Sequence, residues 1–105
     1  MYHWVEHPGI EQEVEILRIR APHVSLSLAR DVATVVSELR NMDLYKTPGV
    51  SETIDWVEAL MTVGADEIEP EVFNSTLGAL LKYREDQQRV RNRGFGDVLA
   101  AVRQG

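Results

Sequence analysis

Cysteine is absent from this chain of 105 residues, which excludes a disulfide framework, a thiolate metal site and a thiol nucleophile. Long apolar runs are absent too. No stretch approaches the roughly 18 residues that span a membrane, and the first residues do not form a secretory signal pattern. The chain is long enough for one hydrophobic core but not for two. We therefore predict a single small cytoplasmic domain without a membrane partner.

Basic residues are fewer than acidic ones, with 11 Lys and Arg against 17 Asp and Glu, and the formal net charge is −6. Binding to nucleic acid normally requires a basic face that neutralises phosphates. The acidic balance therefore argues against a dedicated nucleic-acid binder, although the totals leave room for a local basic patch.

Familiar catalytic and metal-binding patterns are missing as well. The Gly-x-Ser-x-Gly motif is absent, and the serines stand near predicted helix starts, where capping explains them. The acidic pairs Glu67/Glu69 and Glu85/Asp86 flank turns or charged helical surface, and we interpret both as solvated. The histidines are His3, His7 and His23. None has an acidic residue at a spacing typical of metal ligands. We predict no catalytic residue and no metal ligand.

The stretch over residues 44–61 is predicted to be a loop that leads into a buried helix. A Thr-Pro-Gly run at 47–49 interrupts any preceding helix, and Ser51 offers a side-chain oxygen that would cap the amides of the next one. Glu52 in the first turn suits the positive end of the helix dipole. Gly64 provides a left-handed end. The apolar residues of this helix share one wide face and are Ile54, Trp56, Val57, Leu60, Met61 and Val63.

Two helices are predicted before this stretch. Apolar spacing and the signs of the end charges predict a helix over residues 10–21, which Pro22 stops. A longer helix follows over residues 28–42, with Ser25 or Ser27 as its cap. Its apolar residues recur at the spacing that suits packing against other helices.

The second half of the chain predicts one more main helix. Pro70 stands where a first helical residue tolerates it, and we expect this helix to continue past Tyr83 into a charged extension. That extension, Arg84 to Arg93, carries four arginines that would suit phosphate or an acidic partner. Acidic neighbours in the same segment favour a solvated helix end instead. A short last helix over 98–103 is also predicted.

The fold class that follows is all-α: a small helical bundle of four main helices, with a short N-terminal strand and a short C-terminal helix. The strand is predicted over residues 2–6 from aromatic and β-branched content, yet no second strand follows. A lone strand cannot satisfy its backbone hydrogen bonds. Either its partner strands lie outside this sequence, or the segment is irregular.

Four segments occur in an order that no generic helical bundle requires. Residues 2–8 read Tyr-His-Trp-Val-Glu-His-Pro, and residues 13–18 read Glu-Val-Glu-Ile-Leu-Arg. The other two are residues 43–56, Asp-Leu-Tyr-Lys-Thr-Pro-Gly-Val-Ser-Glu-Thr-Ile-Asp-Trp, and residues 76–86, Thr-Leu-Gly-Ala-Leu-Leu-Lys-Tyr-Arg-Glu-Asp. Their most specific portions are residues 46–56 and residues 77–83. Together the four segments resemble the C-terminal helical lid of MoxR-type AAA+ ATPases, over nearly the whole chain to about Arg91.

The resemblance implies a division of the chain. Residues 1–8 would be a remnant of the last strand of the ATPase core, residues 9–93 the helical lid, and residues 94–105 a tail or short helix. ATP and Mg would bind the core of the full-length parent. This chain has no Gly-x-x-x-x-Gly-Lys-Ser/Thr phosphate loop, so we expect no cofactor and no ATP hydrolysis in the fragment alone.

The resemblance also implies a function and partners. The lid would pack on its own ATPase core, cover one side of the nucleotide and pass nucleotide-driven motion to neighbouring subunits of a ring. Family members act as chaperone-like ATPases that mature or assemble other complexes, often with a von Willebrand factor A domain protein. The sensor-2 region that approaches the nucleotide would comprise Lys46, Ser51 and Glu52. Glu52 stands about where the family has its sensor arginine, and Lys46 is the nearby cation that would substitute.

The alternative is a free-standing helical module that binds a protein or nucleic acid through the segment from Arg84 to Arg93. The two hypotheses differ in salt dependence, because binding to nucleic acid falls steeply as salt rises.

Overall fold

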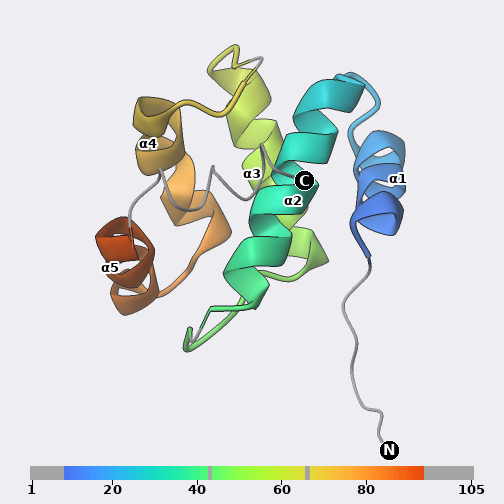
Figure 1. The fold of residues 1–105 in the computed structure, drawn as a ribbon. Coiled ribbons are helices and arrows are strands. Elements are labelled where there is room, and N and C mark those ends of the chain that lie inside the picture. Colours follow the sequence, from blue (N-terminus) through green and yellow to red (C-terminus); the bar gives the residue numbers. More distant parts are fainter. Residues whose placement is uncertain (1–8, 43, 66, 94–105) are drawn as a thin grey trace, which may run out of the picture.

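Five α-helices follow one another along the part of the chain that the computed structural model describes, residues 9–42, 44–65 and 67–93 (Figure 1). They are α1 (Ile10–Arg20), α2 (Leu26–Arg40), α3 (Val50–Thr62), α4 (Pro70–Leu80) and α5 (Arg84–Arg93). No strand occurs within these ranges, so the all-α class is confirmed for them. The predicted strand at 2–6, the core remnant at 1–8 and the tail or helix at 94–105 lie outside the described residues.

Two helix pairs build the core. α1 packs along α2 and α3 packs along α4, while α1 and α2 both contact α3 and so join the two pairs. α5 contacts α4, on the opposite side of the molecule from α1 (Figure 1). The Cα radius of gyration of 12.9 Å is that of a compact domain of this length. The largest fully buried apolar side chains are Leu17, Leu39, Trp56, Leu60, Phe73, Leu77, Leu80 and Leu81.

Local side chains set several helix ends as predicted. Ser25 caps α2, because its hydroxyl oxygen accepts a hydrogen bond from the Leu28 amide at 3.1 Å. Pro70 occupies the first turn of α4, where its missing N–H leaves no helix bond unmade. Gly64 follows α3 with a φ angle of 73°, a left-handed conformation that would strain any other residue. These three predictions are confirmed.

The predicted cap of α3 is wrong. The helix begins at Val50, so Ser51 lies inside its first turn and is exposed. Gly49 is the N-cap residue, and its amide donates to a carboxylate oxygen of Glu52 at 3.0 Å. An acidic side chain three residues into the helix therefore satisfies the amide at the helix start, and no hydroxyl cap is needed.

The buried face of α3 is shorter than its apolar pattern predicts. Trp56 and Leu60 are buried, and the Trp56 indole donates to the Thr76 hydroxyl in α4 at 2.7 Å. Val63, however, is 57% exposed. The helix ends at Thr62, so Val63 no longer follows the helical face, and its predicted burial is wrong.

The predicted continuation of the fourth helix into the charged segment is also wrong. α4 ends at Leu80, the backbone is extended at Leu81, and α5 begins at Arg84 as a separate helix. Within one straight helix the two leucines would point about 100° apart. The break leaves both of them buried. The Gln87 side chain donates to the Leu81 carbonyl at 2.9 Å and so satisfies a group at the break.

Candidate functional site

The connection between α2 and α3 carries Lys46 and leads into the first turn of α3, where Ser51 and Glu52 lie. Asp86 in α5, only 1% exposed, accepts hydrogen bonds from the backbone amides of Tyr45 at 2.8 Å and Lys46 at 2.9 Å. Bonds to an ionised carboxylate are shorter and stronger than neutral ones. The backbone at this point is therefore fixed, while the side chains of Tyr45 and Lys46 are exposed.

The prediction that Glu85 and Asp86 form a solvated pair is wrong for Asp86. Glu85 is exposed, whereas α5 directs Asp86 into the molecule. The amides that Asp86 binds are 41 and 40 positions away in the sequence. Because the two acids are neighbours of the same charge, nothing local distinguishes the one that binds backbone from the one that faces water.

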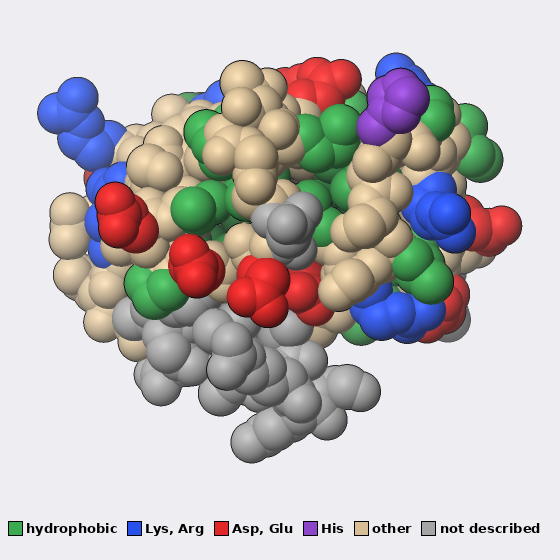
Figure 2. Space-filling view, turned by 90° about the horizontal axis from the view of Figure 1, so that it is seen from above, with side chains coloured by type: hydrophobic (Ala, Val, Ile, Leu, Met, Phe, Trp, Pro, Cys, Tyr) green, Lys and Arg blue, Asp and Glu red, His purple; other side chains and the backbone are tan. Residues whose placement is uncertain are grey.

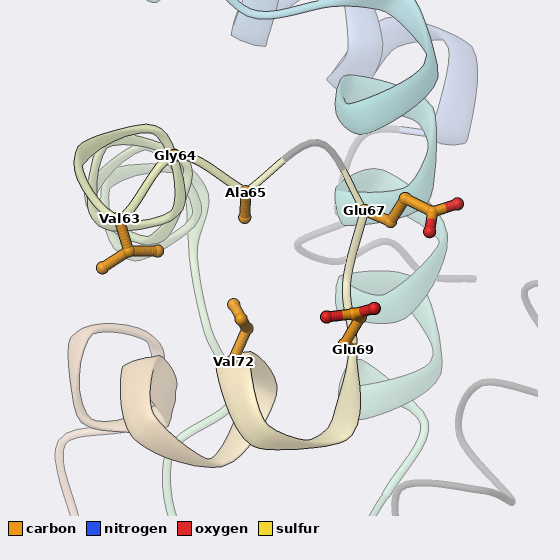
Figure 3. A pocket seen from close by; sticks show the side chains of 6 residues that line it. All are labelled: Val63, Gly64, Ala65, Glu67, Glu69 and Val72. Atoms are coloured by element: carbon orange, nitrogen blue, oxygen red, sulfur yellow. The ribbon is translucent and has the colours of Figure 1, made fainter.

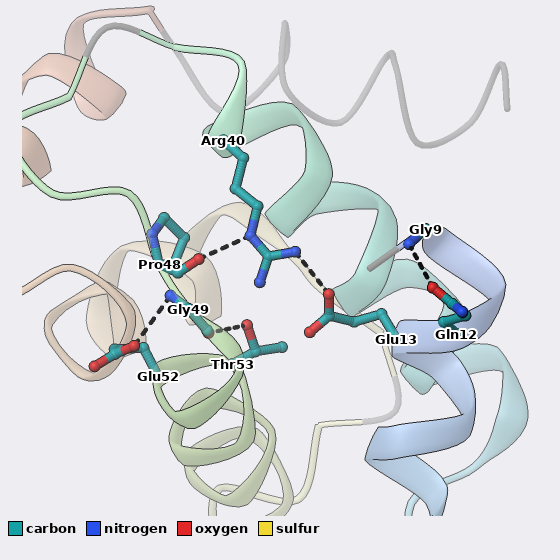
Figure 4. Close-up of polar contacts among 8 residues, drawn as sticks. All are labelled: Gly9, Gln12, Glu13, Arg40, Pro48, Gly49, Glu52 and Thr53. Carbon is teal, nitrogen blue, oxygen red and sulfur yellow. Dashed lines mark hydrogen bonds and ion pairs between the residues drawn. The ribbon is translucent and has the colours of Figure 1, made fainter. Parts of the chain in front are cut away.

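A buried ion pair holds the other end of the connection (Figure 4). Arg40, the last residue of α2, donates from Nη1 to Glu13 Oε1 in α1 at 2.7 Å and from Nε to the Pro48 carbonyl at 2.8 Å. Its side chain is 6% exposed and that of Glu13 is 2% exposed. Two further atoms of this pair, Glu13 Oε2 and Arg40 Nη2, are buried without a hydrogen-bond partner in the described structure. The pair ties α1, α2 and the connection together.

The first turn of α3 forms the remaining part of the site (Figure 4). Besides the bond from the Gly49 amide to Glu52, the Thr53 hydroxyl donates to the Gly49 carbonyl at 2.8 Å. Burial alone would raise the pKa of Glu52. Hydrogen bonds from the backbone amides of Glu52 and Gly49, together with Lys46 and Lys82, outweigh burial and hold that pKa below its ordinary value.

The structure brings two of the three predicted site residues together. Lys46 and Glu52 interact electrostatically, while Ser51 is exposed in the first turn of α3. Lys82, between α4 and α5, also acts on the Glu52 carboxylate, although no sequence pattern indicates it. Its proximity depends on how α4 packs on α3, which spacing along the chain does not encode.

Arg91 and Arg93 of α5 contact other helices of the fold. Arg91 Nη2 donates to the Asn74 carbonyl in α4 at 3.4 Å, and Arg93 Nη2 lies 3.7 Å from Glu38 Oε1 in α2. Both arginines are exposed, as expected for the far end of the charged segment, but each also interacts with another helix. Val90 is fully buried and anchors α5. The segment is thus less available to a phosphate backbone than its sequence indicates.

A cavity of about 310 Å³ lies where α3 leads into α4 (Figure 3). Its lining residues are Val63, Gly64, Ala65, Glu67, Glu69 and Val72. Figure 3 shows Ala65 and Val72 directed toward each other, while the Glu67 carboxylate points away from them. Over the described ranges, no group of three or more His, Asp or Glu side chains is placed to hold a metal. This cavity therefore has fewer fixed polar groups than the connection between α2 and α3, which Arg40, Glu52 and Asp86 hold in place and which we call the clamped connection.

Acidic and basic side chains are both spread over the face seen from above, with apolar side chains between them (Figure 2). None of the helices in the described part of the chain has the length and apolarity to cross a membrane. Comparisons with known protein families, with curated proteins and with solved structures found no match.

Proposed function

We propose that this chain is the helical lid of a MoxR-type AAA+ ATPase. In the parent protein it would couple ATP binding and hydrolysis to the maturation or assembly of partner complexes. The lid packs on its own ATPase core and on neighbouring subunits of a ring, and it changes position with the nucleotide. ATP, Mg and the hydrolytic groups belong to the core. A von Willebrand factor A domain protein is the proposed partner outside the ring.

The clamped connection between α2 and α3 is the observation that carries this proposal. Arg40, Asp86 and Glu52 hold it from three different helices. Asp86 is buried and lies in α5, which is neither of the two helices that the connection joins. The same connection overlaps residues 46–56, one of the two most specific parts of the resemblance. A loop held this firmly moves together with the helices. This supports a role in transmitting the displacement of the lid to neighbouring subunits.

The charges beside this connection support a modified sensor region. The carboxylate of Glu52 is engaged by the Gly49 amide at the start of α3, where the family places a sensor arginine. Lys46 and Lys82 are exposed cations near that carboxylate. In the parent protein these two lysines, rather than residue 52, would approach the nucleotide phosphates.

The DNA in frame before the Met1 codon provides the first test. We expect it to encode a Gly-x-x-x-x-Gly-Lys-Ser/Thr phosphate loop and a strand that ends in magnesium-binding acids. Finding neither would show that the proposal is wrong. So would ATP hydrolysis by the 105-residue chain itself at the rate of an intact ATPase.

Substitution of the two lysines in the parent protein provides the second test. Lys46→Ala and Lys82→Ala should each lower kcat/KM for ATP by about five- to tenfold, the effect of losing roughly 1 kcal/mol of interaction with phosphate. Arg18→Ala is the matched control, because Arg18 is an exposed cation on α1. Equal effects of all three substitutions would contradict the sensor role.

A further inference from the structure

Two exposed tyrosines face each other beside the clamped connection. Tyr45, between α2 and α3, is 73% exposed, and Tyr83, just before α5, is 49% exposed. Their ring centroids lie 6.1 Å apart, with the rings tilted by 57°. A cleft of about 310 Å³ is lined by these two tyrosines and Glu85. Exposed aromatic side chains that are held in contact are typical of the residues that dominate protein interfaces.

Both tyrosines lie on backbone that α5 holds in place. The Asp86 carboxylate binds the amides of Tyr45 and Lys46, and the Gln87 amide donates to the Tyr83 carbonyl at 3.1 Å. The Gln87 side chain also holds the carbonyl of Leu81. A surface whose backbone is already ordered loses little entropy on binding, which favours affinity.

Each tyrosine adjoins a lysine, so that Tyr45-Lys46 lies opposite Lys82-Tyr83. Both lysines are exposed, and both act on the same carboxylate, that of Glu52. Because each lysine directly follows or precedes a tyrosine of the pair in the chain, both cations lie next to the cleft. Cations beside an aromatic cleft favour an occupant that combines negative charge with an apolar side chain.

We propose that the surface formed by Tyr45, Lys46, Lys82 and Tyr83 binds an acidic segment of another protein, with one apolar side chain of that segment packed against the two rings. The cleft is at the lower end of the roughly 300–1,000 Å³ that small-molecule pockets occupy, which suits a single side chain better than a cofactor. Glu85 also lines the cleft, so the apolar side chain of the segment enters the cleft and its acidic residues lie beside Lys46 and Lys82. This inference goes beyond the proposed function and requires no ATPase core; in the parent protein the acidic segment and the nucleotide phosphates would compete for Lys46 and Lys82.

Selection from a random dodecapeptide phage library on the immobilised 105-residue chain tests the proposal. We expect enrichment of acidic peptides that contain an aromatic or branched aliphatic residue. Fluorescence anisotropy with the most enriched synthetic peptide should show that Tyr45→Ala and Tyr83→Ala each raise Kd by at least about tenfold. Lys82→Glu should raise Kd by a similar factor, and Kd should increase with salt because opposite charges are screened.

Ile19→Ala and Arg18→Glu are the matched controls. Ile19 is 73% exposed, as Tyr45 is, and both control residues lie on α1, away from α5. Circular dichroism melts should show that every variant remains folded, because none of the changed side chains is buried. Enrichment of neutral or basic peptides, no enrichment, or equal Kd values for the tyrosine and control variants would overturn the proposal. Tighter, tyrosine-dependent binding of a single-stranded DNA oligonucleotide would overturn it in favour of nucleic acid. Because the readout is peptide binding, the result is independent of whether the ATPase assignment holds.

Discussion

Buried charged side chains fix the connection between α2 and α3. Glu13 and Asp86 are each 1% exposed, and the Arg40 side chain is 6% exposed. Excluding a charge from water is costly unless it is paired or hydrogen-bonded. Each of these residues meets that requirement with a partner on another element, so the position of the connection depends on α1, α2 and α5 together.

Removal of one partner of the buried ion pair tests its role. Arg40→Met should lower the free energy of unfolding by about 3–5 kcal/mol, because it leaves the Glu13 carboxylate buried without its cation and also frees the Pro48 carbonyl. Urea unfolding followed by circular dichroism measures this change.

Two further variants serve as its comparison. The double variant Glu13→Leu/Arg40→Met should recover part of the lost stability, since no unpaired charge remains buried. Arg30→Met removes the cation of the exposed Glu11–Arg30 pair and should leave the urea midpoint nearly unchanged. If Arg40→Met and Arg30→Met had equal effects, burial would not be what matters.

Glu52 should contribute to the pH dependence of stability. Its pKa in the folded chain lies below the ordinary value of 4.5. A carboxyl group with a lowered folded pKa stabilises the fold fully above its unfolded pKa, and this contribution is lost as pH falls through the folded pKa. Glu52→Gln should therefore reduce stability at pH 7 by roughly 0.3–1 kcal/mol, the usual effect of a charge at a helix N-terminus. The difference in stability between Glu52→Gln and the unsubstituted 105-residue chain should disappear in acid.

Thermal melts of both chains between neutral and acidic pH measure this effect. Glu58→Gln is the control, because Glu58 is an exposed acid in the same helix but beyond its first turn. If the melting temperatures of Glu52→Gln and of the unsubstituted chain differed by the same amount at every pH, the charge at the helix start would not be responsible.

At the scale of elements, the break between α4 and α5 shows that tertiary packing overrides the helix-forming preference of the local sequence. The run from Pro70 to Arg93 has the composition of one long helix, yet α4 ends at Leu80 and α5 begins at Arg84. The break leaves Leu81 in the core, and α5 lies where Asp86 reaches the α2–α3 connection. Neither contact is encoded by residue spacing within the segment.

The packing of α2 against α3 predicts the cost of removing core side chains. Leu39 in α2 and Leu60 in α3 are both fully buried. Leu39→Ala and Leu60→Ala should each destabilise the fold by about 2–5 kcal/mol, because each leaves a cavity among closely packed neighbours. Urea unfolding measures the loss, and Ile19→Ala, at a position 73% exposed, is the control. Losses below about 0.5 kcal/mol at both buried positions would mean that these helix faces do not meet in one core.

At the scale of the whole molecule, the distribution of charge argues against the nucleic-acid form of the alternative function. The net charge is −6, and two arginines of α5 contact Glu38 and the Asn74 carbonyl within the fold. A free-standing nucleic-acid module would instead present a basic face to its ligand.

A salt titration tests that alternative directly. We expect no binding of the chain to a short double-stranded DNA at low salt, measured by fluorescence anisotropy, because the net charge of −6 disfavours contact with phosphates. Binding that weakens steeply as salt increases would favour the nucleic-acid module, and Arg91→Ala together with Arg93→Ala would then identify α5 as the surface.

The sequence by itself determined the elements that depend on near neighbours. Apolar spacing placed the first three helices and the start of α4, and Ser25, Pro70 and Gly64 act at helix ends as their chemistry requires. These interactions span at most a few residues, so a pattern in the chain suffices to predict them.

Only the tertiary structure decided which polar residues form the candidate site. Lys46, Ser51 and Glu52 were predicted to belong together, but Arg40 in α2, Asp86 in α5 and Lys82 between α4 and α5 join them. Their meeting depends on the angles at which helices pack and on the break before α5. Those features arise from the summed burial of the whole core, and no short-range pattern records that sum.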